Sequence, residues 1–540
     1  MVARKVFASA AMTDETRGTR ESGVTKPIWN EGEIRPSSGP LGSSASADVC
    51  IVGAGITGLT TAYLLARLGR SVIVVDQGAI GGGDTSRTSA HLASALDDGF
   101  VQLEQLHGHD GARLAAQSHA AAIDLIEHIQ MREGIRCDFE RVDGFLHLGP
   151  DHDAEFLHAE ALAAERAGLK VEWLDVAPGP KLGAGPCLRF ADQAQFHPRR
   201  YIAGLVRAIE GMGGRIHTDA HVDRFEGGEP ARIVTSNGRE VTAGALVIAT
   251  NVPVNDRVVI HTKQAAYRSY LIALDIPRDA VPMALHWDTA SPYHYVRVVR
   301  SDPMAQRDVL LVGGADHRTG DDDAPAGRWD HLESWAREKF EMAGEVIDRW
   351  SGQIMEPIDG LAFIGRNPTD APNVYIATGD SGHGLTHGTI AATMFASMLS
   401  GKKDPYEALY DPRRRSLRAL PTFAKESWAT AMHYADWVRP ADVKHEEDIE
   451  AGEGATMLVL GRRLAVYRDE LGRCHRFSAT CRHLGGVVHW NAAEKTWDCP
   501  CHGARYDREG RVVNGPAKDD LERVAEATVT PVLTPALGGK

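Results

Sequence analysis

Residues 48–68 read DVCIVGAGITGLTTAYLLARL, in which an apolar strand runs directly into a glycine-rich turn and then into a helix. The run Val49–Val52 is typical of a strand that is buried on both faces. In the turn Gly53-Ala54-Gly55-Ile56-Thr57-Gly58, the first glycine allows a tight bend and the second lets the backbone approach a pyrophosphate. The third glycine lets the helix pack on the strand, and the helix N-terminus faces the phosphate charge. This order predicts a dinucleotide site in a Rossmann-type fold.

A second strand supports that interpretation. Ser71–Val75 is apolar and ends in Asp76, eighteen residues beyond Gly58, where an acidic side chain can bind ribose hydroxyls. A glycine turn can also join packed elements without a ligand, but the strand, helix and acid together favour dinucleotide binding. No second unit of this kind is evident, so a separate NAD site is not supported.

Length and composition limit the possible classes of protein. A chain of 540 residues exceeds the length of about 250–300 residues at which single cores stop growing, so two or more domains are expected. The net charge of -14 argues against a nucleic-acid partner, because such proteins present basic surfaces. No apolar run reaches the ~18 residues that a transmembrane segment needs, and the N-terminus lacks an apolar signal core. The expected location is the cytoplasm.

Four segments follow one another along the chain. Residues 1–46 mix charges with Ser, Gly and Pro and are predicted to be a disordered tail. Residues 47–410 alternate short apolar strands with Ala- and Leu-rich helices, as in an α/β domain. Residues 411–449 have apolar residues at helical spacing and are predicted to be a helical connector. Residues 450–540 change to short strands and turns, as in a small all-β domain.

A metal site is indicated by two short motifs in the last segment. Cys481-Arg482-His483 is followed, after fifteen residues, by Cys499-Pro500-Cys501-His502-Gly503. Each motif supplies one thiolate and one imidazole, as a Rieske [2Fe-2S] centre requires. A tetrahedral zinc site also accepts two Cys and two His. The flanking residues favour the Rieske centre over zinc, because Leu484-Gly485, Tyr506-Asp507 and Gly515-Pro516-Ala517 resemble the loops of Rieske proteins.

The Rieske resemblance implies the ligand assignment and two departures from the respiratory proteins. Cys481 and Cys499 would hold one iron, and His483 and His502 the other. The position of a second loop cysteine is Gly486, so Cys501 is expected to be a free thiol. A serine that would hydrogen-bond the cluster is Ala504, whereas Tyr506 is present. Fewer hydrogen bonds to sulfur should lower the potential, and Ala504→Ser should raise it.

The 47–410 segment resembles the D-amino acid oxidase family of FAD enzymes, which includes glycine, sarcosine and dimethylglycine oxidising members. The resemblance rests on Gly81-Gly82-Gly83-Asp84-Thr85-Ser86-Arg87-Thr88-Ser89-Ala90-His91, on Ala245–Thr250 and on Asn373–Thr386. It implies a Rossmann-type FAD-binding domain with an inserted mixed-sheet substrate domain, so the fold class is α/β with a small all-β Rieske domain appended.

The same resemblance implies which residues contact FAD. The Gly53–Gly58 turn and Asp76 would hold the ADP half, and Arg87 and Thr88 would line the cleft. The loop that would close over the isoalloxazine contains Gly379, Gly382, His383, Gly384, Leu385 and Thr386. His91 matches a histidine that some relatives bond covalently to FAD; a noncovalent histidine is the alternative.

Candidate catalytic residues are His91, Tyr270, Tyr293, Tyr295 and Arg297. The tyrosines and the arginine lie in the region that supplies the substrate cavity in the resembled family, where they could bind a carboxylate. Ordinary sheet residues with polar tips are the alternative. A different site is also possible at Asp380, His383 and His387, whose spacing fits a two-His-one-carboxylate iron site.

These features predict FAD-dependent oxidation of an amine or amino acid, with electrons leaving through one Rieske cluster to a one-electron acceptor protein. The alternatives are a flavin/Rieske redox relay without substrate turnover, and a reductase fed by NAD(P)H.

Overall fold

The structure is a computed structural model that describes residues 23–30, 32–178, 182, 185–255, 260–300, 306–321 and 325–525. The glycine-turn unit has the predicted order, because strand β1 (Ala45–Val52) leads into helix α1 (Ile56–Arg67) and then strand β2 (Val72–Val75). β1 and β2 are parallel, with Val52 opposite Val75. Their carboxyl ends therefore lie together at the edge where the glycine turn begins.

These two strands belong to the first sheet of the body, the part of the chain from residue 47 to 410. The other strands of this sheet are β7 (Arg215–His217), β8 (Val222–Glu226), β9 (Ala231–Thr235), β10 (Glu240–Ile248), β16 (Phe363–Arg366) and β17 (Val374–Thr378). The strand order is β16-β17-β10-β1-β2-β7, with β9 pairing β10 and β8 pairing β9. Val49 and Ile51 of β1 pack into one core cluster and Cys50 and Val52 into another, so β1 is buried on both faces.

The second sheet of the body is mixed, as predicted for the inserted domain. Its strands are β3 (His91–Leu92), β4 (Glu140–His147), β5 (Val171–Leu174), β6 (Cys187–Gln195), β11 (Gln264–Pro277), β12 (Leu285–Asp288), β13 (His294–Val299), β14 (Arg307–Arg318) and β15 (Val346–Pro357). The order is β15-β11-β14-β13-β12-β4-β6-β3, with β5 on β6. β11 is antiparallel to both of its neighbours, whereas β12 and β4 are parallel.

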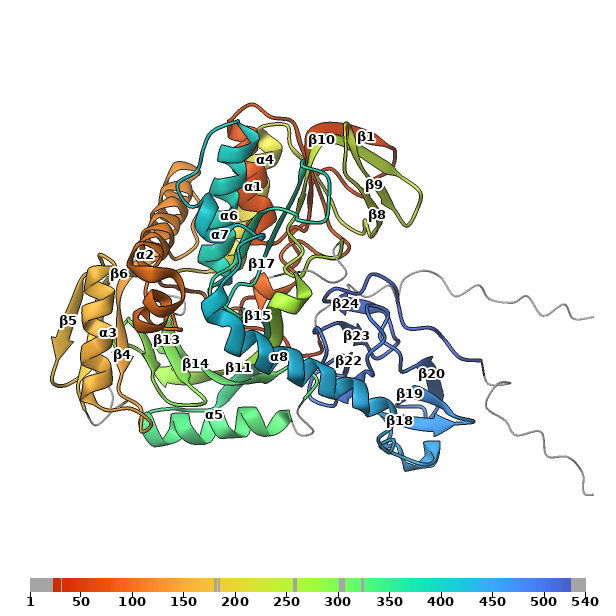
Figure 1. Ribbon diagram of the computed structural model, residues 1–540. Helices are drawn as coiled ribbons and strands as arrows, with labels where there is room; N and C mark the ends of the chain where they lie inside the picture. Colours follow the sequence, from red (N-terminus) through yellow and green to blue (C-terminus); the bar gives the residue numbers. More distant parts are fainter. Residues whose placement is uncertain are drawn as a thin grey trace, which may run out of the picture.

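Helices cover both sheets. They are α2 (Phe100–Arg132), α3 (Ala154–Arg166), α4 (Pro198–Gly211), α5 (Ala326–Lys339), α6 (Gly384–Leu399) and the short α7 (Glu407–Tyr410), with 3-10 turns η1 (Asp84–Ser86) and η2 (His261–Lys263). Figure 1 shows α1, α4 and α6 lying together at the first sheet and α5 lying along the second. α2 bends at Gly108, whose φ of 73° interrupts the helical conformation. Among the described residues, no helix combines the length and the apolar character needed to span a bilayer.

The C-terminal domain consists of two small antiparallel sheets. The first contains β18 (Glu453–Val459), β19 (Arg462–Arg468) and β20 (Cys474–Ser478), and the second contains β21 (His489–Asn491), β22 (Thr496–Asp498), β23 (Arg505–Asp507) and β24 (Val512–Asn514). Trp497 and Tyr506 are fully buried in its core. Both metal-site motifs lie in loops of this domain, one after β20 and the other after β22.

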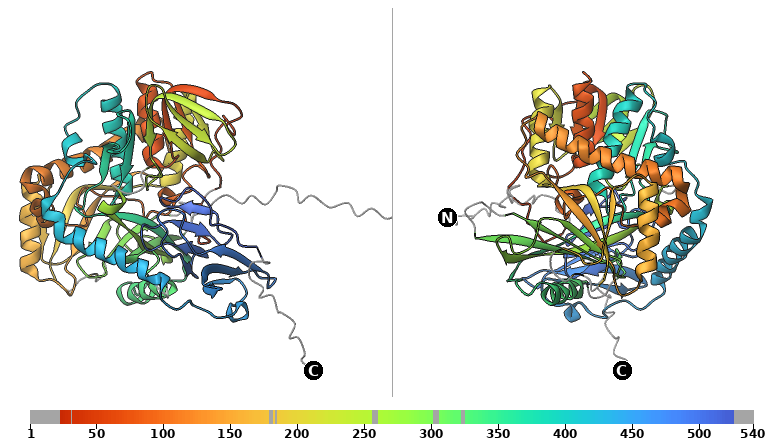
Figure 2. Two further views of the ribbon diagram at one scale, coloured as in Figure 1. Left: turned by 45° about the vertical axis from the view of Figure 1, so that its right-hand side comes forward. Right: turned by 90° about the vertical axis from the view of Figure 1, so that its left-hand side faces the viewer.

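A mostly helical segment joins the body to this domain. It contains η3 (Leu417–Ala419), α8 (Leu420–His433), η4 (Tyr434–Trp437) and η5 (Glu446–Asp448). In both views of Figure 2, α8 runs along the body and leads to the C-terminal domain. Tyr434 Oη and Trp437 Nε1 donate hydrogen bonds to the carbonyls of Leu484 and Gly485, each at 3.0 Å. The segment therefore supports the loop that carries the first metal-site motif.

The segment predicted to be a disordered tail is in part packed on the body. Trp29 is 1% exposed, donates a hydrogen bond from Nε1 to the carbonyl of Thr88 at 2.8 Å and contacts the ring of His197. β1 already begins at Ala45. The prediction is therefore wrong for residues 23–30 and 32–46, because a single buried tryptophan anchors a stretch that has no apolar period. Residues 1–22 lie outside the described part of the chain.

Candidate flavin and iron–sulfur sites

The main cavity of the described structure has a volume of about 310 Å³ and lies at the carboxyl ends of β1 and β2. Its lining includes Gly53, Gly55, Ile56, Thr57, Asp76 and Thr88 of the predicted nucleotide region, together with Gly382, His383, Gly384 and Leu385 of the later loop. Such a crevice beyond the strand ends is where open α/β sheets bind dinucleotides. The cavity therefore joins the two sequence regions that were predicted to contact opposite ends of FAD.

The glycine turn fits a dinucleotide. Gly53 has a φ of 111°, and a Cβ atom there would lie 2.3 Å from the carbonyl oxygen of Ala249. A Cβ atom on Gly58 would lie 1.9 Å from the carbonyl oxygen of Gly53, so only glycine lets the helix pack this closely. Gly55 faces the cavity, and the nearest atom to its Cβ position is Thr85 Oγ1 at 3.0 Å. The turn thus keeps its backbone open to a pyrophosphate.

Asp76 has a structural role in addition to lining the cavity. Its Oδ2 accepts a hydrogen bond from the backbone N–H of Ala54 at 2.7 Å, and its Oδ1 accepts one from Gly78 at 2.8 Å. These bonds fix the glycine turn relative to the end of β2. The same carboxylate faces the position expected for a ribose.

Other predicted FAD contacts are less direct. Gly58, Ala54, Gly379 and Thr386 do not line the cavity but support residues that do. Thr386 Oγ1 lies 2.8 Å from His119 Nδ1, behind the loop. Arg87 is found at the cavity wall, yet its guanidinium donates at 2.7 Å to the carbonyls of Thr25 and Ser351. Its charge is thereby directed away from the cofactor position.

Three of the candidate catalytic residues meet in the cavity. His91, Tyr293 and Tyr295 all line it, and the ring centroids of His91 and Tyr295 are 5.6 Å apart. Burial, with a smaller effect from the charge of Arg297, lowers the pKa of His91 to about 3. His91 Nδ1 lies 2.8 Å from Ser89 Oγ. The imidazole is therefore neutral at physiological pH and held in one orientation.

The other two candidates have structural roles in this fold. Tyr270 is fully buried, and its hydroxyl lies 2.9 Å from His317 Nε2, outside the cavity. Arg297 donates hydrogen bonds to the carbonyls of Ser89, at 3.1 Å, and Ala90, at 2.6 Å. These contacts hold both side chains in packed positions that do not line the cavity, so neither is placed to bind a substrate carboxylate as predicted.

The four predicted metal ligands converge at the loop tips of the C-terminal domain. Cys481 and Cys499 are buried, and contact with the Cys499 side chain raises the pKa of the Cys481 thiol well above its usual range. The imidazole rings of His483 and His502 lie with their centroids 4.9 Å apart. Two adjacent thiolates need a nearby cation, which one iron would supply, and the paired imidazoles suit a second iron. These four residues therefore fit a [2Fe-2S] cluster.

The surroundings of the sulfur atoms agree with the sequence analysis. A Cβ atom on Gly486 would lie 2.6 Å from Cys501 Sγ, so this glycine stands where a second cysteine would be bonded, and Cys501 is a free thiol. Tyr506 Oη lies 3.4 Å from Cys481 Sγ and accepts a hydrogen bond from the backbone N–H of Arg482 at 2.9 Å. The phenol proton is thereby available to the sulfur.

The alternative mononuclear iron site does not form. His387 Nδ1 lies 2.9 Å from the carbonyl oxygen of Asp380, and His387 Nε2 lies 3.2 Å from His119 Nε2. Both ring nitrogens therefore already have partners. Within the described residues, no three His, Cys, Asp or Glu side chains converge on a single point that could hold one metal ion. This also disfavours zinc at the Cys/His motifs, since zinc needs all four ligands on one ion.

The C-terminal domain forms part of the cavity wall. Val512–Gly515 and Lys518 line the cavity, and Asn514 Nδ2 donates a hydrogen bond to Asp84 Oδ2 at 2.9 Å. On the body side, Gln353 lines the cavity and donates a hydrogen bond from Nε2 to the carbonyl of Gly503 at 3.1 Å. Because Gly503 directly follows the predicted ligand His502, one glutamine side chain connects the cavity with the predicted metal site.

His261 of the body covers the imidazole side of the metal site. Its ring centroid lies 4.7 Å from that of His483 and 6.1 Å from that of His502. His261 is only 2% exposed, so this contact is within the molecule. The histidine side of the predicted cluster therefore faces the body.

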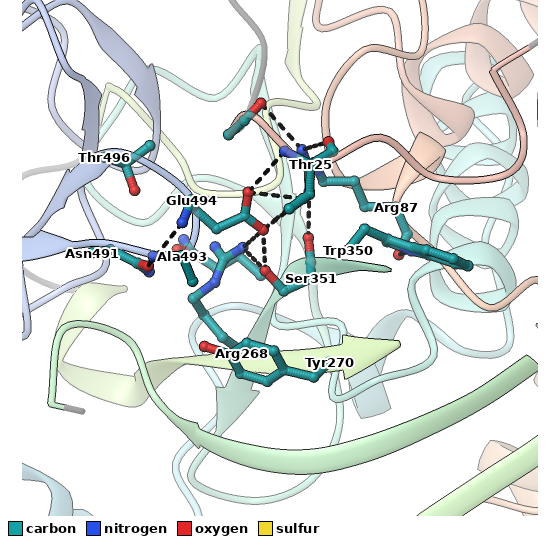
Figure 3. A network of polar contacts seen from close by, with 12 residues as sticks. Thr25, Arg87, Arg268, Tyr270, Trp350, Ser351, Asn491, Ala493, Glu494 and Thr496 are labelled. Atoms are coloured by element: carbon teal, nitrogen blue, oxygen red, sulfur yellow. Dashed lines mark hydrogen bonds and ion pairs between the residues drawn. The ribbon is translucent and has the colours of Figure 1, made fainter. Parts of the chain in front are cut away.

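A buried network of charges holds the two parts together (Figure 3). Glu494, on the turn between β21 and β22, is fully buried and accepts hydrogen bonds from Arg87 at 3.4 Å and Arg268 at 3.2 Å. It also accepts bonds from the hydroxyls of Thr25, at 2.8 Å, and Ser351. Burial alone would raise the pKa of Glu494, but the two guanidinium charges lower it below its usual range. The C-terminal domain is thus fixed to the body by a charged side chain.

The fold and the two sites define a flavoprotein oxidoreductase that carries an iron–sulfur domain on the same chain. The profile of the FAD dependent oxidoreductases (DAO) matches residues 48–398, and that of the Rieske [2Fe-2S] domain matches residues 439–525. The chain belongs to the DAO family of FAD-dependent oxidoreductases, and it binds FAD and one Rieske [2Fe-2S] cluster.

Known proteins share one or both parts. The chain is 30% identical to the putative Rieske 2Fe-2S iron-sulfur protein YhfW of Bacillus subtilis (strain 168), over 92% of this chain and 97% of that protein. It is 27% identical to gamma-glutamylputrescine oxidoreductase of Escherichia coli (strain K12), over 68% of this chain and 87% of that enzyme. The crystal structure of glycine oxidase from Geobacillus kaustophilus superimposes with a TM-score of 0.57, covering 68% of this chain and 99% of that one at 20% identity. The last comparison concerns the fold alone.

Several residues at the site were not predicted. Asp97, Ser269, Trp287 and Gln353 line the cavity, as do residues of β24. Asp97 comes six residues after His91, and its carboxyl group could have been noticed as an acid close to the motif. No local sequence motif indicates that the C-terminal domain lines the cavity, because this depends on how that domain packs against the body.

Tyrosine 506 gives a test of the cluster's environment. Tyr506→Phe removes the hydroxyl that faces Cys481 Sγ, so the reduced and more negative cluster loses stabilisation and its midpoint potential is expected to fall. Ala504→Ser should act in the opposite direction. Redox titration followed by electron paramagnetic resonance measures both. Tyr467→Phe, in the same domain but bonded to Glu470, is the control and should leave the potential unchanged. An unchanged potential in Tyr506→Phe would contradict this account.

Proposed function

We propose that the protein oxidises an amine or amino acid at FAD and passes the electrons through its own Rieske cluster to an external one-electron acceptor protein. The observation that carries this proposal is the Gln353 side chain, which lines the cavity and bonds to Gly503, next to the ligand His502. When bound, FAD accepts two electrons from an organic substrate, and the cluster carries one electron at a time. If one chain divides its electron transfer between a two-electron and a one-electron centre, the two sites must be connected within the molecule.

The residues of the cavity support amine chemistry. An amine must be neutral before its C–H bond can lose a hydride, so a group is needed that accepts the ammonium proton. Asp97 lines the cavity with Oδ2 3.6 Å from His383 Nε2, and its side chain is 36% exposed. This pair is placed to accept the proton, while Tyr293 and Tyr295 orient the substrate from β13 and the residue before it.

The relatives support the same class of reaction. Gamma-glutamylputrescine oxidoreductase acts, by its name, on a compound with an amino group. Covalent and noncovalent contact between His91 and FAD both stay open, and acid precipitation distinguishes them: a yellow pellet would establish the bond, whereas a yellow supernatant with a colourless pellet would exclude it. The cytoplasmic location also stays a prediction.

Anaerobic mixing of the holoenzyme with candidate donors tests the proposal. Bleaching of the flavin by an amine or amino acid is the expected result. Bleaching by NADH alone would support the reductase alternative, and the absence of bleaching by either would support the redox relay. No specific observation of the cavity favours either alternative.

A further inference from the structure

The C-terminal domain contributes one continuous segment to the wall of the main cavity. We call residues 512–518 the β24 segment, since it begins with strand β24. Six of its residues line the cavity: Val512, Val513, Asn514, Gly515, Ala517 and Lys518. Gly55 of the glycine turn and Asp76, which fit a dinucleotide, line the same cavity. The cavity that fits FAD is therefore built by both domains.

Hydrogen bonds join the β24 segment to two different elements of the body. Asn514 Nδ2 donates to Asp84 Oδ2 of η1 at 2.9 Å, and Asn251 Nδ2 of the body donates to the same oxygen at 3.0 Å. Lys518 Nζ donates to the carbonyl of Asp223, on β8, at 3.1 Å. The two ends of the segment are thus fixed to parts of the body that flank the cavity.

The β24 segment also packs closely on the loop that carries the second metal-site motif. Gly515 has a φ of 93°, and a Cβ atom there would lie 2.5 Å from the carbonyl oxygen of Gly503. Gly503 in turn approaches the body so closely that its own Cβ atom would lie 2.3 Å from Ala266 Cβ. Such close-packed contacts resist displacement. The segment is therefore held between the cavity, the metal loop and the body.

Lys518 is placed to supply a positive charge to this cavity. The pyrophosphate of FAD is negatively charged, and the cavity also contains the acidic side chains of Asp76 and Asp84. Among the described residues that line it, the lysine and arginine side chains are those of Lys518 and Arg87. The Arg87 guanidinium is neutralised in the Glu494 network. The Lys518 ammonium donates to a carbonyl, which uses one of its three donors, and it has no carboxylate within ion-pair distance among the described residues.

We infer that the β24 segment is part of the FAD-binding site, in which Lys518 supplies the positive charge for the phosphates of the cofactor's ADP half. FAD is then held between both domains. Its binding stabilises their docking, because a ligand favours the arrangement that completes its site. The Rieske domain thereby has a second role beside carrying the cluster. This role holds whichever donor reduces the flavin, so it does not depend on amine oxidation.

Calorimetric titration of the flavin-free, full-length protein with ADP and with adenosine tests the role of Lys518. Both ligands lack the isoalloxazine, so neither can form a covalent bond at His91. Lys518→Met is expected to raise the Kd for ADP about tenfold, as the loss of one charge-assisted hydrogen bond would. The Kd for adenosine, which has no phosphate, should not change.

Two further variants separate charge from structure. Lys518→Arg keeps the charge and should keep most of the affinity for ADP. Lys444→Met removes an exposed lysine of the connecting segment and should leave both Kd values unchanged. If Lys518→Met binds ADP as well as the unsubstituted protein does, or loses equal affinity for ADP and adenosine, the role given to this lysine is overturned.

Hydrogen exchange of the unsubstituted full-length protein, with and without ADP, is a second and independent measurement. With ADP well above its Kd, the amides of the β24 segment should exchange about tenfold more slowly or slower still, because the ligand stabilises the docked arrangement by mass action. The amides of β18, in the same domain but outside the cavity lining, should change less. Unchanged exchange of the β24 segment would overturn its place in the FAD site, and the proposed oxidation would still stand.

Discussion

Replacement of Cys499 by serine is expected to remove the Rieske signal in electron paramagnetic resonance while leaving FAD bound. Reduction of an external one-electron acceptor such as cytochrome c should fall by more than about a hundredfold, because losing a ligand exceeds the effect of losing a group that only supports one. Flavin bleaching by the amine should persist, since the cavity residues of the body are intact. The two activities are measured separately by stopped-flow absorbance.

Two controls distinguish loss of the cluster from general damage. Cys474→Ser changes a cysteine of the same domain that lies at the start of β20 and outside the metal site. Cys501→Ser removes the free thiol beside Gly486. Both should keep the cluster. If the Cys499→Ser variant still reduced cytochrome c at the normal rate, electrons would leave by a route that does not include the cluster.

The second large effect is expected at the domain interface. Glu494→Gln removes the carboxylate that neutralises Arg87 and Arg268, all three being buried. Breaking a buried pair by removing one partner leaves uncompensated charge, and typically costs about 3–5 kcal/mol of unfolding free energy. The measurement is urea unfolding followed by the visible absorption of the cluster, which reports on the C-terminal domain.

The matched control is Glu470→Gln, in the same domain. Its side chain is 68% exposed and pairs with Arg508 at 3.4 Å, so the expected change in unfolding free energy is below about 0.5 kcal/mol. Equal stability of the Glu494→Gln variant and the unsubstituted protein would contradict the role given to this network.

The Glu494→Gln variant should also slow electron transfer to the cluster, because Gln353 and Gly503 meet across this interface.

The parts of the fold that depend on local patterns could be predicted from the sequence. The Gly53–Gly58 turn requires glycine for steric reasons that act within a few residues, and the structure has the strand, turn and helix in that order. The four metal ligands were implied by the resemblance to Rieske proteins, to which each motif contributes one Cys and one His. The same resemblance implied the free Cys501, because Gly486 stands at the position of the second loop cysteine.

The other features of the fold and the sites depend on packing between segments that lie far apart in the sequence. The hydroxyl of Tyr270 lies beside His317, and Arg297 donates to the carbonyl of Ala90, 207 residues away, so the direction of neither side chain could be deduced from a short motif. Arg87 was placed at the FAD cleft, but its partner Glu494 comes 407 residues later. Trp29 anchors a segment that has the composition of a tail. In each case contacts between segments that are far apart in the sequence decide the outcome.

Rapid-freeze electron paramagnetic resonance of the anaerobic holoenzyme, after mixing with an amine or amino acid that bleaches its flavin, tests directly whether electrons pass from FAD to the cluster. The flavin is expected to bleach first, and the signal of the reduced Rieske cluster should then grow with no other donor present. A bleached flavin beside a cluster that stays oxidised, although its potential permits reduction, would contradict electron transfer between the two sites.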